Sequence, residues 1–322
     1  MPLRPGAECT ECFREGLASF IRTAGTTGKT ARALLSEAMA MVLPRLGHHP
    51  PPVAGAPVYA WLRERLGRLD IFEQQKKSAT EEMMMRADSL RAAYASTADP
   101  PRAALRACCW ANLIDVAQGR ELPEAEILME TLSRPLAIDE TERFLEQLSG
   151  AGSLLVLGDN AGETVLDMLF LEQLAGGGCE LAYAVRPLPV LNDATSSDAE
   201  AAGLGRVARL VSTGLDAPTV VPSACSPGFA ELLRGADLVL SKGQGNLEGL
   251  ILGNGEIDPH RIYYSFVVKC DVIADLVSQP RWSGIFASGA SLEAIAGRRE
   301  SRASCPSTST SASTATGYSS SS

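Results

Sequence analysis

Apolar side chains in the first 150 residues recur three and four positions apart, which places them on one face of an α-helix. The run His48-His49-Pro50-Pro51-Pro52 interrupts this pattern, because proline cannot continue a helix. The pattern therefore predicts a helical N-terminal domain over residues 1–150. The expected helices lie within 13–21, 31–42, 58–62, 83–94, 103–117 and 140–148.

The pattern changes near residue 151 to short, continuous apolar runs separated by helical stretches at 163–174 and 229–233. Strands that are apolar throughout are typical of a mainly parallel sheet covered on both faces. We therefore expect an α/β domain over 151–297, followed by a disordered tail over 298–322 that becomes rich in Ser and Thr from about Ser304. The predicted strands are 154–157, 180–185, 207–211, 238–240 and 262–268.

Composition narrows the class of protein. The 322 residues are 45% hydrophobic, and 29 Lys and Arg against 38 Asp and Glu give a net charge of −9. This acidity argues against nucleic acid or an anionic membrane as the main partner. The chain has no transmembrane run and its N-terminus lacks the apolar core of a signal peptide, so we expect a cytoplasmic protein whose eight cysteines are thiols. The sequence does not set an oligomeric state.

Asp159 and Asn160 stand where a predicted strand gives way to a predicted helix. Carboxylate and amide oxygens suit Mg²⁺, Mn²⁺ or a similar cation, although the same residues are also common helix N-caps. Glu163, just after them, is either an ordinary acid of the first helical turn or a partner or base in the site.

Asn192 and Asp193 follow the next strand through a proline-rich link. The pair could simply form a turn. Asp193 comes 34 residues after Asp159, however, a suitable length for a βαβ unit, which brings both strand ends to one edge of the sheet. A cation site and a turn are equally compatible with this spacing.

The segment Ser241-Lys242-Gly243-Gln244-Gly245-Asn246 follows another strand. Glycines there allow a ligand to approach the backbone, and a lysine can neutralise phosphate oxygens, although the segment matches neither the Walker A loop nor the dinucleotide fingerprint. The alternative is a glycine-rich loop with a solvated lysine. Lys269, at the end of the last strand, is a ligand contact or a surface lysine.

Cys9-Thr10-Glu11-Cys12 forms a CxxC motif without a second pair of suitably spaced cysteines or histidines. A zinc site would need such a second pair, and no βαβ pattern surrounds the motif as in a thioredoxin. We therefore interpret these cysteines as packing thiols. With only three histidines in the chain, an all-histidine metal site is also not expected.

These segments together resemble the damage-control phosphatases, the ARMT-like family known as domain of unknown function 89. The resemblance rests first on DNAGE at Asp159, NDATSSDA at Asn192 and ADLVLSKGQGNLEGL at Ala236. Four further segments resemble its prokaryotic, CxxC-containing branch: CTECF at Cys9, GRLDIFEQQKKSATEEMM at Gly67, WANLIDVAQG at Trp110 and VVKCDVIA at Val267. In this chain Ala111-Asn112 replaces the usual Gly-Asn, and Ile71 stands where proline is common; both positions are expected to lie away from the metal.

The resemblance implies a helical N-terminal region packed on a Rossmann-like three-layer α/β/α core, and a metal-dependent phosphatase acting on small phosphorylated metabolites. The metal ligands would be Asp159, Asn160 and Asp193, with Mn²⁺, Co²⁺, Ni²⁺ or Mg²⁺ as the ion. The expected catalytic set is Asp159, Asp193, Lys242 and Glu163, and the expected substrate-binding set is Lys242, Gly243, Gly245, Asn246, Asn192 and Lys269. Two alternatives are a methyltransferase acting on protein carboxylates and a non-catalytic regulator that binds a metal or nucleotide.

Overall fold

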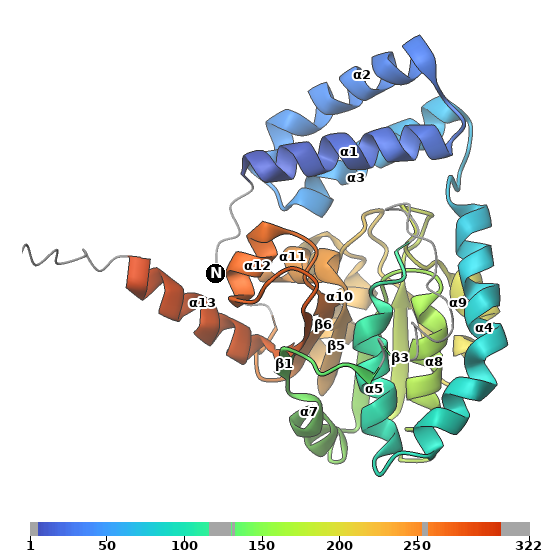
Figure 1. The fold of residues 1–322 in the computed structure, drawn as a ribbon, viewed down its shortest axis with the longest axis vertical. Coiled ribbons are helices and arrows are strands. Elements are labelled where there is room, and N and C mark those ends of the chain that lie inside the picture. The colour runs from blue at the N-terminus through green and yellow to red at the C-terminus, as the bar shows by residue number, and fades with distance from the viewer. Residues whose placement is uncertain (1–5, 116–129, 131–132, 253–256, 304–322) are drawn as a thin grey trace, which may run out of the picture.

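The computed structural model describes residues 6–115, 130, 133–252 and 257–303, which form a central sheet with helices on both faces (Figure 1). The strand order is β1-β7-β6-β5-β2-β3-β4, and only the β6–β7 pair is antiparallel. This confirms the expected α/β fold with a mainly parallel sheet. The strands are β1 (Ile138–Asp139), β2 (Ser153–Leu157), β3 (Glu180–Val185), β4 (Arg209–Ser212), β5 (Leu238–Lys242), β6 (Ile262–Val267) and β7 (Gly284–Ser288).

Helices occupy most of the N-terminal half and the connections between strands. They are α1 (Ala7–Thr23), α2 (Gly28–Leu46), α3 (Pro51–Leu66), α4 (Glu73–Ala95), α5 (Pro100–Ala111), α7 (Thr141–Leu148), α8 (Glu163–Glu172), α9 (Ser196–Ala201), α10 (Pro227–Gly235), α11 (Gln244–Leu252), α12 (Asp271–Val277) and α13 (Gly289–Ala303).

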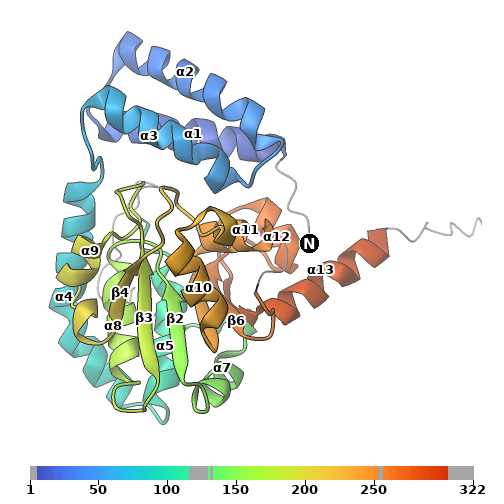
Figure 2. The same ribbon diagram turned by 180° about the vertical axis from the view of Figure 1, so that it is seen from behind.

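Successive residues of each central strand pack into different cores, which makes the molecule three-layered. In β2, Leu154 and Val156 join a core with α4, α5, α7 and α8, while Leu155 and Leu157 join a second core with α10, α11 and α12. Both faces of these strands are therefore dry, as their continuous apolar sequence predicts. Figures 1 and 2 show the two helical layers from opposite sides.

Helices α1, α2 and α3 form a separate core that lies across the end of the sheet where the loops gather (Figures 1 and 2). Arg63 of α3 donates to the Pro189 carbonyl at 2.7 Å and pairs with Asp216, and Val190 packs into the three-helix core. These contacts attach the three helices to loops that follow β3 and β4.

The sheet and the helices that cover it include residues from before and after the domain boundary that we expected near residue 151. Helices α4, α5 and α7 cover one face of the sheet, and β1 adds a strand at its edge, although all four elements precede residue 151. Among the described residues, only α1–α3 form a core of their own on the N-terminal side.

Several predicted boundaries were wrong. Helix α5 ends at Ala111 and not at 117, and 116–117 lie outside the described residues. Helix α13 runs to Ala303, so 298–303 are helical; the rest of the expected tail, 304–322, lies outside the described residues. Strands β1 and β7 were not predicted.

No helix in the described part of the chain is long and apolar enough to cross a membrane.

Candidate functional site

The segments that follow β2, β3 and β5 meet at one edge of the sheet, because these neighbouring strands run parallel. Ala194 N donates to the Asp159 carbonyl at 2.8 Å, and Ala161 N donates to the Asn192 carbonyl at 2.9 Å. Asn246 Nδ2 donates to the Gly158 carbonyl at 3.0 Å. The structure thus brings together the three predicted segments.

Asp159 and Asn160 are not the cap of α8, so that alternative interpretation was wrong. The N-cap is Gly162, at φ +87, and no side chain caps the helix. A Cβ at Gly162 would approach Ala79 to 3.0 Å and Ile114 to 3.2 Å. The turn therefore needs glycine, and it leaves both polar side chains free to face the site.

Asn112 lies at the centre of this cluster, although we expected it to lie away from the metal. Its Nδ2 donates to Asp159 Oδ2 and to Glu163 Oε1, each at 2.8 Å, while its Oδ1 accepts from Val267 N at 3.2 Å. Asn160 Nδ2 also donates to Glu163 Oε1, at 2.7 Å. The only signal in the sequence was that Asn112 belongs to the WANLIDVAQG segment; its helical periodicity gave no hint.

Arg186 holds Asp193 and was also missed. Its Nε donates to Asp193 Oδ2 at 2.7 Å, and its other two nitrogens donate to the Thr219 carbonyl and to Asn246 Oδ1. Arg186 is 2% exposed and directly follows the buried strand β3. An arginine at a predicted strand end, next to the proposed ligands, was the signal that could have identified it.

Lys242 is fully buried, so it is not the solvated lysine of the alternative interpretation. Its Nζ donates to Asp167 Oδ1 at 2.6 Å and to Glu163 Oε2 at 3.2 Å. Lys269 is not a surface lysine either: its Nζ donates to Asp115 Oδ2 at 2.9 Å. Asn192 donates to the other oxygen of Asp115, at 3.2 Å.

The expected glycine-rich loop is mostly helix, because β5 ends at Lys242 and α11 begins at Gln244. Gly243 N donates to the Ser265 carbonyl and is therefore not available to a ligand. The amide of Asn246 is used within the protein, by Gly158, Lys242 and Arg186. A Cβ on Gly245 would approach the Pro218 carbonyl to 2.6 Å. Substrate contacts by these residues stay predictions.

The site carries a surplus of negative charge. Among the described residues, five carboxylates face three cationic groups, leaving two negative charges uncompensated. Burial, followed by the nearby Glu163 and Asp193 carboxylates, raises the pKa of Asp159 well above its usual value. Such a cluster favours an added cation. The carboxylates belong to Asp115, Asp159, Glu163, Asp167 and Asp193, and the cations to Arg186, Lys242 and Lys269.

Three oxygens in this cluster accept no hydrogen bond from any described residue: Asp159 Oδ1, Asn160 Oδ1 and Asp193 Oδ1. Each belongs to one of the proposed metal ligands, and each is a hard donor suited to a divalent cation. Within the described residues, no group of three His, Cys, Asp or Glu side chains is arranged to hold a metal ion. The proposed ligands are a different kind of set, because they comprise two carboxylates and one amide. The donor chemistry and the charge surplus fit a divalent ion.

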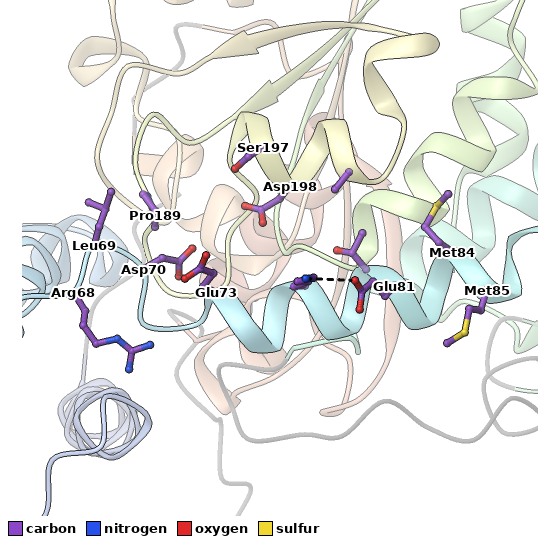
Figure 3. Close-up of a pocket in the computed structure, with 13 residues that line it drawn as sticks. Arg68, Leu69, Asp70, Glu73, Glu81, Met84, Met85, Pro189, Ser197 and Asp198 are labelled. Atoms are coloured by element: carbon purple, nitrogen blue, oxygen red, sulfur yellow. Dashed lines mark ion pairs between the residues drawn. The ribbon is translucent and has the colours of Figure 1, made fainter.

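Next to this site, Lys76 of α4 forms ion pairs with two further acids. It pairs with Asp70 at 2.6 Å and Asp198 at 2.7 Å and is 2% exposed. Asp198 also completes a capping box with Thr195 at the start of α9. Asp70 and Asp198 line a pocket of about 980 Å³, and none of the proposed metal, catalytic or substrate-binding residues is part of its lining. Figure 3 shows both acids beside α4 and α9.

Cys9 and Cys12 lie in α1, and both are free thiols. Burial, followed by repulsion from Cys270 and Glu248, raises the pKa of Cys12 to about 11. A thiol with such a pKa is protonated near neutral pH and is a poor nucleophile. Cys12 is nevertheless exposed and Cys9 is half-buried, so the structure does not bear out the interpretation as packing thiols.

Comparisons with known proteins agree on one family. The model of the damage-control phosphatase ARMT1-like domain matches residues 6–282. A damage-control phosphatase of Pyrococcus horikoshii is 28% identical over 233 residues, covering 72% of this chain and 79% of the relative. An uncharacterized protein of Methanocaldococcus jannaschii is 29% identical over 232 residues, covering 70% of this chain and 75% of the relative.

A solved structure also resembles this fold. The crystal structure of a DUF89 family protein from Pyrococcus horikoshii matches with a TM-score of 0.81 and 25% identity. The match covers 89% of this chain and all of the other one.

Proposed function

Since the chain belongs to the damage-control phosphatase ARMT1-like family, we propose that it is a metal-dependent phosphatase that hydrolyses phosphomonoesters of small metabolites. The observation that carries the proposal is the surplus of two negative charges around three unbonded oxygens, beside a buried lysine. Such a surplus suits one divalent cation, and the lysine suits a phosphate.

Asp159, Asn160 and Asp193 would hold the cation, and their donor types suit Mn²⁺, Co²⁺, Ni²⁺ and Mg²⁺ alike. When bound, the ion would polarise a phosphoryl oxygen. Arg186 keeps Asp193 in place through the 2.7 Å bond to Oδ2, and Asn112 does the same for Asp159 at 2.8 Å. These bonds use one oxygen of each acid, so the second oxygen of each would be available to bind the cation.

The chain's own cations would bind the rest of the phosphoryl group. Burial alone would lower the pKa of Lys242, but the Asp167 and Glu163 carboxylates raise it above its usual value, so Lys242 stays charged. The first N–H groups of α11 add the positive end of a helix. These groups would stabilise the charge that develops on the phosphoryl oxygens during hydrolysis.

A buried carboxylate near the phosphoryl group would accept the proton of the attacking water. Burial raises the pKa of Glu163, with Lys242 opposing the shift, and it raises the pKa of Asp193, with Arg186 opposing it. A carboxylate with a raised pKa is a better base than an exposed one. Asp193 and Glu163 are therefore the two candidates for this role.

The test is hydrolysis of p-nitrophenyl phosphate and a panel of sugar phosphates by chelator-treated protein, with each of the four ions added in turn. We expect turnover only with a divalent ion, and a loss of about 100-fold or more in Asp159→Ala and Asp193→Ala. Asp88→Asn is the control, because the Asp88 side chain is 98% exposed.

Full activity in both alanine variants would contradict the assignment of the ligands. Tight metal binding without turnover on the whole panel would contradict the phosphatase itself and favour a binding protein.

A further inference from the structure

The Lys242 ammonium is held by two acids on one face of α8. Glu163 and Asp167 are four residues apart, so their side chains project from the same side of the helix. Nζ lies 3.2 Å from Glu163 Oε2 and 2.6 Å from Asp167 Oδ1. An ammonium has three N–H donors, and side chains of the described residues accept from two of them.

Asp167 has a partner on each oxygen. Oδ1 accepts from Lys242, and Oδ2 accepts from the Tyr183 hydroxyl at 2.7 Å. Asp167 is 2% exposed and Tyr183 is fully buried, so water does not compete for either bond. Burial, followed by the Asp167 carboxylate, raises the pKa of Tyr183 well above its usual value, so the hydroxyl remains a donor.

Tyr183 is itself held in place by Gly158, in the turn that follows β2. It lies on β3, next to β2, and the backbone of Gly158 rests on its ring: a Cβ at Gly158 would lie 2.6 Å from Tyr183 Cε1. The hydroxyl therefore has little freedom, and it fixes the orientation of the Asp167 carboxylate. That carboxylate in turn fixes Lys242.

Glu163 and Asp167 differ in their other hydrogen-bond partners. Glu163 Oε1 accepts from Asn112 and Asn160, and its bond to Lys242 is the longer one. Asp167 accepts from Lys242 and Tyr183, lies beside the Cys108 thiol, and has no hydrogen bond to Asn112 or Asn160. Asp167 is therefore the main anchor of Lys242, and Glu163 belongs to the cation side of the site.

We propose that Tyr183 and Asp167 form a positioning pair that holds the Lys242 ammonium where charge develops on the phosphoryl group. This inference rests on the proposed phosphatase activity and deepens it. Neither side chain touches the substrate; both act through Lys242. Because a positioned cation matters most in the transition state, the pair acts on kcat more than on KM.

The test compares two tyrosines that each lose one hydroxyl. Tyr183→Phe removes the bond to Asp167, whereas Tyr263→Phe removes a 3.0 Å bond to Gln147, away from the site. Both rings are fully buried. We expect Tyr183→Phe to lower kcat about tenfold, about 1.4 kcal/mol of transition-state stabilisation, with KM changed less than about twofold. Tyr263→Phe should leave both constants unchanged.

Asp167→Asn tests the second member, since it keeps the size of the side chain but removes the charge that faces Lys242. We expect a loss in kcat of about 100-fold. Thermal unfolding of all three variants shows whether they fold. Calorimetric binding of orthovanadate, which mimics the transition state, and of inorganic phosphate requires no turnover: Tyr183→Phe should weaken vanadate binding about tenfold and phosphate binding less than about twofold.

A merely structural contact predicts a different result: a lower unfolding temperature in Tyr183→Phe, with kcat and vanadate affinity like those of Tyr263→Phe. That result would overturn the positioning pair while leaving the phosphatase intact. If the wild-type protein neither hydrolyses phosphoesters nor binds either anion, the phosphatase proposal fails first, and the positioning pair fails with it.

Discussion

Gly243, directly after β5, packs against the side chain of Asp159, which follows β2. A Cβ added at this position would overlap the Asp159 carboxylate, and the backbone adopts φ +78. Both observations require glycine, the first by contact and the second by conformation. Glycine at this position therefore allows the Asp159 side chain to keep its orientation.

Gly243→Ala should therefore reduce phosphatase activity more than stability. We expect kcat/KM to fall about 100-fold, because Asp159 must move, and the free energy of unfolding to fall by about 1–2 kcal/mol, because a left-handed backbone disfavours alanine. Gly228→Ala in α10 is the matched control: its Cβ would meet nothing within 4 Å. An active Gly243→Ala variant would show that Asp159 is not needed where the structure places it.

The sequence identified most of the site residues that follow strands, with Arg186 as the exception, and missed Asn112 and Asp167, which reach the site from helices. Asp159, Asp193 and Lys242 could be placed together because parallel strands end at one edge of a sheet. Asn112 reaches the site from the end of α5, and Asp167 from the second turn of α8. No pattern along the chain shows that these two positions face strand ends, because that depends on how the helices pack.

Helix α4 also shows that the sequence alone does not reveal contacts between distant elements. Its length was underestimated, since the sequence predicted only 83–94 of Glu73–Ala95. The first turn carries Lys76, whose ammonium lies between Asp70, just before α4, and Asp198, in the first turn of α9. The spacing of apolar residues predicts which face of a helix packs against a core. It cannot predict a buried lysine on that face, because such a lysine depends on acids from other parts of the chain. Strand β7 was also missed, although at five residues it is as long as β2 and β5.

Lys76→Met should destabilise the protein strongly. The change leaves the Asp70 and Asp198 carboxylates close together without their cation, and removing one partner of a buried ion pair costs about 3–5 kcal/mol. Lys77→Met is the control, because the neighbouring lysine is 67% exposed. Urea unfolding measures both. Equal free energies of unfolding in the two variants would mean that the Lys76 cluster contributes no more than a surface lysine.

In the whole molecule, Glu248 of the α/β layers is close enough to α1 of the three-helix core to affect its cysteines. It lies on α11, where Gln244 donates to it at 3.1 Å, and its negative charge disfavours the thiolate forms of Cys9 and Cys12. Burial raises the pKa of Glu248 from 4.5 to about 7. The folded protein therefore keeps a proton that the unfolded chain has released between these two pH values.

The free energy of unfolding should consequently fall as pH rises through this window, and Glu248→Gln should remove that part of the fall. Between about pH 5 and about pH 8 we expect the wild type to lose about 1–3 kcal/mol more than the variant, since one pKa unit corresponds to about 1.4 kcal/mol. Urea unfolding at both pH values checks this, with Glu231→Gln, an exposed acid on α10, as control. Parallel profiles for wild type and Glu248→Gln would rule out the shifted pKa.

We infer that the buried acids at the sheet edge hold one divalent cation. Binding of Mn²⁺ to chelator-treated protein, followed by electron paramagnetic resonance, tests it without any substrate. We expect one tightly bound ion per chain in the wild type and in Asp88→Asn, and a loss of affinity of at least about 100-fold in Asp159→Ala. Binding by Asp159→Ala as tight as by the wild type, or no binding by either, would contradict it.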